Sequence, residues 1–169
     1  MRKIKIFRAV TVVLILLNMG LIFFFSAQKA TASDKTSDGF ITVLCKAVVS
    51  RFDSLSPSEK EKTVKGLSHA VRKAAHMAEF ASLSFLCSLF FSSFGFKFKN
   101  FAAGFSVSVF YAATDEFHQL FVEGRSGQLS DVCIDAAGAL IGAVFAFLVW
   151  LSVERIKKKP ILKKQKTNG

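Results

Sequence analysis

The chain has 169 residues, enough for one domain, and 51 % of them are hydrophobic. Its formal net charge is +11, but the basic residues concentrate in three clusters and no aromatic-interleaved basic surface accompanies them, so a nucleic-acid-binding protein is not expected. The apolar residues form long unbroken blocks, which indicate an integral membrane protein.

The first apolar block predicts a transmembrane helix over about residues 7–25, since only Arg8 is charged between Phe7 and Phe25 and a bilayer core takes roughly 17–25 helical residues. A basic start, an apolar run and then Ala-Thr-Ala at 30–32 also resemble a secretory signal with its cleavage site. The apolar run is long for a signal peptide and ends well before that site. We therefore favour an uncleaved helix.

An outer segment over residues 29–68 follows, and two helices are predicted within it. The first is amphipathic, because apolar residues recur at helical spacing at Ile41, Leu44, Val48 and Phe52. The second begins at a capping box formed by Ser56 and Glu59, and Gly66 is expected to break or bend it. Both helices fit either padding along the outer membrane interface or a lid over a site.

Three further transmembrane helices are predicted over about residues 70–94, 100–121 and 131–152. The expected fold is therefore all-α: a compact bundle of four transmembrane helices over residues 1–152, with the amphipathic outer segment between helices one and two. A basic cytoplasmic tail occupies residues 153–169. The basic clusters, Arg2–Arg8, Lys97 with Lys99, and Arg155–Lys166, then share one side, so the positive-inside pattern predicts that both termini are cytoplasmic.

Charged residues gather at the outer ends of the last three helices. On helix two, Arg72, His76 and Glu79 share one face, as Asp115 and His118 do on helix three. On helix four one face holds two acids and then two packing glycines, in the order Asp131, Asp135, Gly138 and Gly142. Charges cost about 2.5–3.5 kcal/mol each in lipid, so these groups must face one another or a wet cavity.

Two interpretations follow: a polar network that only fixes helix packing, or an outward-facing polar pocket, which we favour because the acids outnumber the cations. The candidates for acid/base catalysis are His76, Glu79, Asp115, Glu116 and His118. The candidates for ligand binding are Arg72, Lys73, Gln119, Arg125, Asp131 and Asp135. No cofactor is expected. A metal ion held by His76, Glu79, Asp115 and His118 is the weaker alternative.

Four motifs, "FFFSAQ", "RKAAHMAEF", "DEFHQLFVEGRSG" and "DVCIDAAGALIG", stand in order at the ends of these helices. Together they resemble the VanZ-like family of small membrane proteins, over roughly residues 23–142. The resemblance adds Ser26, Gln28 and Gly124 to the residues of interest, and this sequence departs from the family at Glu123, where proline is frequent. It implies a bacterial plasma membrane and, from the family's namesake, low-level resistance to the lipoglycopeptide teicoplanin.

Two functions of different classes remain open. The first is a binding protein of the cell envelope, whose partners are membrane lipids and a lipoglycopeptide or lipid-linked cell-wall precursor. The second is a membrane-embedded acid/base or metal-assisted enzyme that modifies a lipid-linked envelope substrate. A transporter is less favoured unless the chain forms a homo-oligomer, because no internal repeat is visible.

Overall fold

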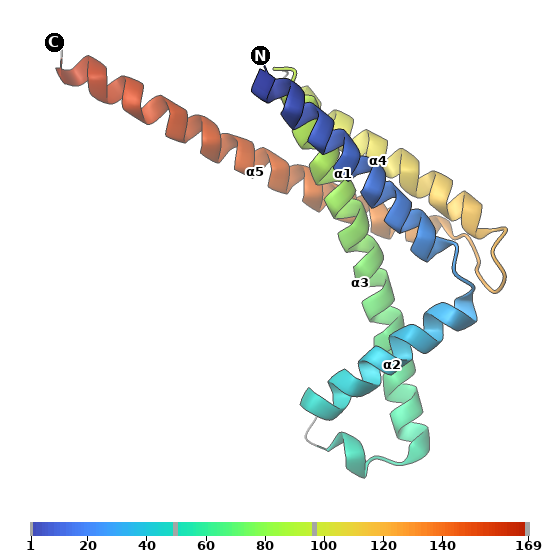
Figure 1. Cartoon of the computed structure of the whole chain (residues 1–169). Helices are drawn as coiled ribbons and strands as arrows, with labels where there is room; N and C mark the ends of the chain where they lie inside the picture. Colours follow the sequence, from blue (N-terminus) through green and yellow to red (C-terminus); the bar gives the residue numbers. More distant parts are fainter. Residues whose placement is uncertain (1, 49–50, 96–97, 168–169) are drawn as a thin grey trace.

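The computed structural model describes residues 2–48, 51–95 and 98–167, with side chains given except at 30, 32, 34, 48 and 157–167. Within these ranges all the regular structure is helical (Figure 1). The elements are α1 (Arg2–Ser26), α2 (Ala30–Val48), the short 3₁₀ helix η1 (Phe52–Ser54), α3 (Pro57–Ser92), α4 (Phe98–Gln119) and α5 (Leu129–Thr167). The all-α class is therefore confirmed.

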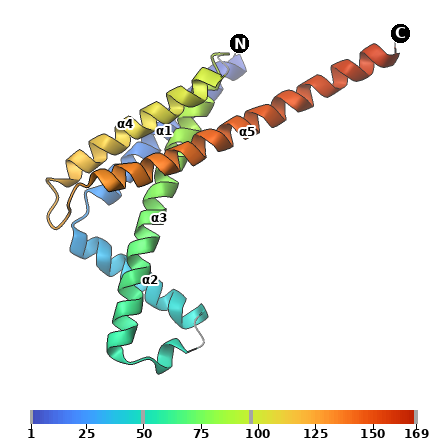
Figure 2. The ribbon, with the colours of Figure 1, turned by 180° about the vertical axis from the view of Figure 1, so that it is seen from behind.

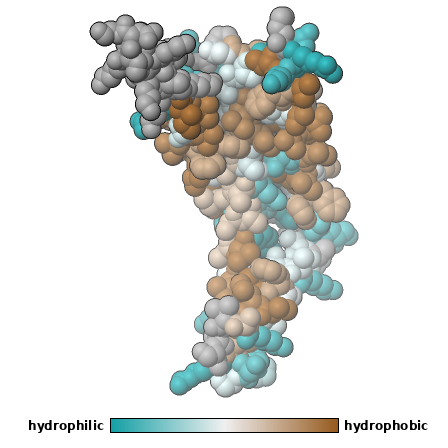
Figure 3. All heavy atoms as spheres, turned by 60° about the vertical axis from the view of Figure 1, so that its left-hand side comes forward, coloured by the Kyte–Doolittle hydropathy of each residue, from teal (hydrophilic) through white to brown (hydrophobic). Residues whose placement is uncertain are grey.

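Three of the helices, α1, α3 and the part of α5 up to Ile156, are long and apolar enough to cross a membrane. Large apolar side chains stay exposed along them, for example Leu16 at 62 % and Phe145 at 57 %. Figure 3 shows apolar side chains over much of the upper body of the molecule and polar ones at its extremities. Exposed apolar surface on this scale is what lipid covers, so these three helices fit a membrane protein. The fourth span, α4, remains a prediction.

Helix α3 is the centre of the bundle, and α1, α4 and α5 all pack on it. The core consists of Ile22 from α1, Phe80, Leu83 and Cys87 from α3, and Ala112 from α4. Aliphatic and aromatic side chains at three- and four-residue spacing on α3 place this core on one face of the helix.

The N-terminal end of α1 lies beside the connection between α3 and α4 (Figures 1 and 2). Arg8 donates from Nε to the Ser93 hydroxyl at 2.9 Å and from Nη2 to the Ser93 carbonyl at 2.8 Å. Its guanidinium carbon also lies 3.7 Å from the centre of the Phe94 ring. The one charge in the first apolar block is therefore satisfied at this end of the bundle.

Helix α5 crosses α3 at close range through its small residues (Figure 2). A Cβ built on Gly138 would overlap the Met77 carbonyl, and one built on Gly142 would overlap the Ala81 carbonyl. The two glycines thus let the backbones of α5 and α3 meet directly. Beyond the crossing α5 runs on through Thr167, past the end predicted near Ser152.

Two predictions about the outer segment were wrong. Gly66 does not break the helix, because α3 is one helix of 36 residues that begins at the predicted capping box and runs directly into the bundle. A glycine inside a helix costs only about 1 kcal/mol relative to alanine, too little to end a capped helix that is packed further along.

The second error concerns the extent of the amphipathic helix: Phe52 was expected on the same helix as Ile41 and Leu44, but α2 ends at Val48 and Phe52 lies in η1. Ile41, Cys45, Phe52 and Val64 form a small separate core, whereas Leu44 is 45 % exposed. Because η1 turns Phe52 back towards α3, the buried face of α2 is set by contact with Val64 and not by the sequence pattern alone. The predicted position of the Val48 side chain lies outside the described residues.

Candidate functional site

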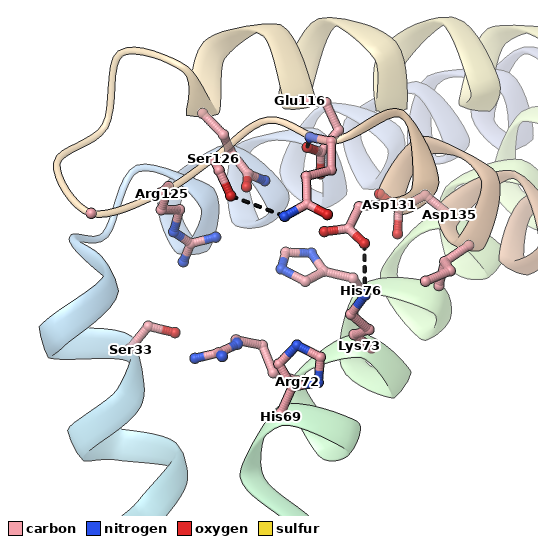
Figure 4. A pocket seen from close by; sticks show the side chains of 14 residues that line it. Ser33, His69, Arg72, Lys73, His76, Glu116, Arg125, Ser126, Asp131 and Asp135 are labelled. Carbon is pink, nitrogen blue, oxygen red and sulfur yellow. Dashed lines mark hydrogen bonds and ion pairs between the residues drawn. The ribbon is translucent and has the colours of Figure 1, made fainter. Parts of the chain in front are cut away.

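A cavity of about 250 Å³ lies where α3, α5 and the connection between α4 and α5 meet, at the end of the bundle opposite the N-terminus (Figures 1 and 4). The first turns of α2 close it on one side through Ser33. Nearly all of its lining side chains are polar or charged. The charged clusters that the sequence places on three helix ends therefore do contribute to one cavity.

The basic side of this cavity comes mainly from α3. His69, Arg72, Lys73 and His76 all line it, as their spacing of three and four residues on one helix face allows. Lys73 Nζ lies 2.8 Å from Asp131 Oδ1, and about a third of each side chain is exposed. One cation of α3 is thus tied to α5, across the cavity.

The acidic side comes from α4 and α5. Glu116 is 7 % exposed and accepts a hydrogen bond of 3.0 Å from the Gln128 backbone N–H. Asp135 is 3 % exposed, and within the described residues it has no hydrogen bond or ion pair. A buried carboxylate without a partner is costly, so Asp135 is a group of the site that a ligand could satisfy.

Arg125 holds the connection between α4 and α5 against the end of α1. Its Nε donates to the Gln28 carbonyl at 3.0 Å and its Nη2 to the Phe25 carbonyl at 3.1 Å. Gly124 precedes it with φ of +78°, a backbone conformation that favours glycine. These two features aim Arg125 at the cavity and close the end of the bundle.

A second cavity of about 330 Å³ adjoins the first, since Ser33, Arg72, His76 and Arg125 line both. Apolar side chains absent from the first cavity line the second, namely Phe25, Val71 and Ala75. Phe25 is 45 % and Val71 37 % exposed, so this cavity lies beside surface-exposed apolar side chains of α1 and α3. The two cavities therefore form a site with one polar part and one partly apolar part.

Several candidate residues lie outside the first cavity. Glu79 lines the second one, and its Oε2 lies 3.3 Å from His76 Nδ1, although the two atoms are not aligned as a hydrogen bond. Asp115 is buried behind the site, where its Oδ2 accepts a hydrogen bond of 3.0 Å from Gln119. His118 lines neither cavity; its ring packs 4.8 Å from that of Phe23.

Metal ligands do not assemble in the part of the chain that the structure describes: no three His, Cys, Asp or Glu side chains are placed to hold one ion. His76 and Glu79 face the cavities, whereas Asp115 and His118 do not line them.

Four polar residues that line the first cavity were missed from the sequence, Ser33, His69, Ser126 and Gln128, and so was the apolar Ile134. His69 could have been found, because it continues the face of Arg72 and His76 one turn earlier. Ser33 carries no such signal, since it enters the site only through the way α2 lies against α3.

Comparison of the chain with curated proteins and with solved structures gives no match. Residues 11–150, which include the whole of the site and most of each candidate span, match the family model described as VanZ/LLP1. The resemblance seen in the helix-end motifs is thereby confirmed, and the chain belongs to the VanZ/LLP1 family.

Proposed function

We propose that this protein is a binding protein of the plasma membrane whose polar cavity takes the head of a lipid-linked envelope component. The proposal rests on one observation: the charged cavity and the partly apolar cavity share a wall, which includes Arg72, Arg125 and His76. A lipid-linked molecule has the same two parts. Arginine suits a phosphate or carboxylate head because its guanidinium presents several fixed N–H donors.

The topology we propose has four transmembrane helices, both termini in the cytoplasm and the cavity facing outward. The basic residues Arg2, Lys3 and Lys5 stand at the N-terminal end of α1, and Arg8 joins that end to Ser93. The cavity lies at the opposite end, beyond the α1 terminus at Ser26. The positive-inside rule then orients the bundle.

The topology can be tested with single cysteines, one in the first turn of α4 and one after its end, in a variant from which the three native cysteines have been removed. Both chosen positions, Ser126 and Lys99, are exposed. Ser126→Cys is expected to react with a membrane-impermeant maleimide in intact cells, and Lys99→Cys only after permeabilisation. Labelling of both cysteines in intact cells would contradict a membrane-spanning α4.

We further propose that binding at this site gives low-level protection against teicoplanin, by capture of the drug or of a lipid-linked cell-wall precursor. The reason is chemical: a lipoglycopeptide carries both an acyl chain and charged groups, which match the two parts of the site. Vancomycin, which lacks the acyl chain, should be affected less.

Susceptibility to the two drugs in a sensitive host tests this role. The wild-type chain is expected to raise the teicoplanin concentration that stops growth, and Arg72→Gln to return it to that of the empty vector. A charge-assisted hydrogen bond contributes about 1.5–3 kcal/mol, so its loss weakens binding roughly tenfold or more. Lys62→Gln, an exposed change on the same helix, is the matched control. Equal protection by Arg72→Gln at equal membrane level would contradict a role for the cavity.

One observation favours a second function, acid/base chemistry on the bound molecule. His76 lines both cavities and its Nδ1 faces the Glu79 carboxylate at 3.3 Å, so the pair is close enough to tighten into a hydrogen bond when a ligand binds. Glu79→Gln separates the two functions in the same assay. Catalysis requires near-complete loss of protection, whereas simple binding retains most of it.

A further inference from the structure

The chemistry of the site changes in a fixed order from one cavity to the other. The second cavity has the apolar side chains, Phe25, Val71 and Ala75. The shared wall has the arginines, Arg72 and Arg125. Three acids, Glu116, Asp131 and Asp135, line the first cavity and not the second.

Figure 4 shows the same separation between labelled side chains: Arg72 and Arg125 lie on the side of Ser33, whereas Glu116, Asp131 and Asp135 lie on the far side of His76. Two charged residues depart from this order. Lys73 lies with the acids and is already tied to Asp131 at 2.8 Å, and Glu79 lines the second cavity, where its Oε2 lies 3.3 Å from His76 Nδ1. A ligand that carried only negative charge would use the arginines but meet the buried acids unfavourably.

Asp135 points to what the far side of the cavity binds. It is 3 % exposed, lines the cavity and has no hydrogen bond or ion pair within the described residues. Glu116 beside it accepts one backbone hydrogen bond, and an ionised carboxylate can accept several. A primary ammonium group, with three N–H donors, would supply the missing partners of both carboxylates.

We propose that the ligand is an aminophospholipid. Its acyl chain occupies the second cavity, its phosphate lies between Arg72 and Arg125, and its ammonium group lies against Asp135 and Glu116. In such a lipid the chain, the phosphate and the amine follow one another in the same order as the three parts of the site. This inference rests on the proposed function and names the substrate class.

The test uses the full-length purified chain in detergent micelles that contain one lipid at a time, with retained lipid measured by native mass spectrometry. The probes share the same acyl chains: phosphatidylethanolamine, phosphatidylglycerol without an amine, and phosphatidylcholine with a methylated one. Phosphatidylethanolamine is expected to bind roughly tenfold or more tightly than the other two, since only it donates N–H groups to the acids.

Two variants separate the parts of the site. Asp135→Asn keeps the size of the side chain, and it is expected to reduce phosphatidylethanolamine binding to the level of phosphatidylglycerol; Glu116→Gln gives an independent check. Arg72→Gln is expected to weaken the binding of all three lipids. Asp53→Asn, an exposed change outside both cavities, is the control for the acids.

The outcomes distinguish this inference from the proposed function. Equal binding of the three lipids, all weakened by Arg72→Gln, would overturn the aminophospholipid and leave the lipid-binding function. Lipid binding that Arg72→Gln does not change would overturn both. Soluble phosphoethanolamine is expected not to displace the bound lipid. If it did so at low concentration, the site would take the free head group. That result would overturn the assignment of the acyl chain to the second cavity.

Discussion

Replacing Gly142 by leucine is expected to unfold the bundle or to prevent its accumulation in the membrane. A single Cβ at this position would already overlap the Ala81 carbonyl on α3, and the next glycine along α5, Gly138, meets the Met77 carbonyl in the same way. The obstacle is backbone, which cannot rotate aside as a long side chain can. Overpacking of a tight core typically costs 1–3 kcal/mol, and here the two helix axes would have to separate.

The matched control for this change is Gly20→Leu. Gly20 lies in the middle of α1 with open space around it, so the same substitution adds apolar surface and meets nothing. Membrane level by immunoblot and thermal midpoint in detergent are the measurements. We expect a strong loss of both for Gly142→Leu and little change for Gly20→Leu; equal behaviour of the two would refute direct backbone contact between α3 and α5.

The change Phe52→Ala is expected to release α2 while the bundle stays folded. Phe52 is 2 % exposed and belongs to the small core with Ile41, Cys45 and Val64, which is separate from the core around Phe80. Truncation of a buried phenylalanine typically costs about 3–5 kcal/mol. A core this small has little stability to spare. The loss of Phe52 packing is therefore expected to detach α2 from α3.

Limited proteolysis with trypsin measures the release, because α2 carries the exposed residues Lys35 and Lys46. Phe52→Ala should be cut within α2 at protease levels that leave the wild type intact, with the α3–α5 fragment still protected. Phe40→Ala removes the same side chain from a position that is 62 % exposed and should resist as the wild type does. If the two variants are cut alike, α2 is not held by this core.

Release of α2 should also reach the site. Ser33 lies on α2 and lines both cavities, and Thr36 and Ser37 line the second one. Helix α2 therefore forms part of the wall of the site. This position is relevant to whether the segment over residues 29–68 is interfacial padding or a lid. Loss of lipid retention in Phe52→Ala, with the bundle intact, would establish that α2 is needed for binding.

The sequence by itself determined the all-α class, the long apolar helices that fit a membrane protein, and the start of α3. Each of these depends on local information: unbroken apolar runs, and a Ser56–Glu59 capping box that the structure contains as predicted. The family motifs, which stand at helix ends, likewise needed no tertiary contact to be recognised.

Only the tertiary structure decided which of the charged residues share the cavity. Helical spacing places Asp115 and His118 on one face, yet it does not say that His118 packs against Phe23 of α1 or that neither residue lines a cavity. It also could not show that Cys45, and not Leu44, is buried on α2, or that Ser33 lines the same cavity as Arg72. The physical reason is that the rotation of each helix about its axis is set by contacts between distant segments, such as Gly138 on Met77, and periodicity within one helix does not contain that information.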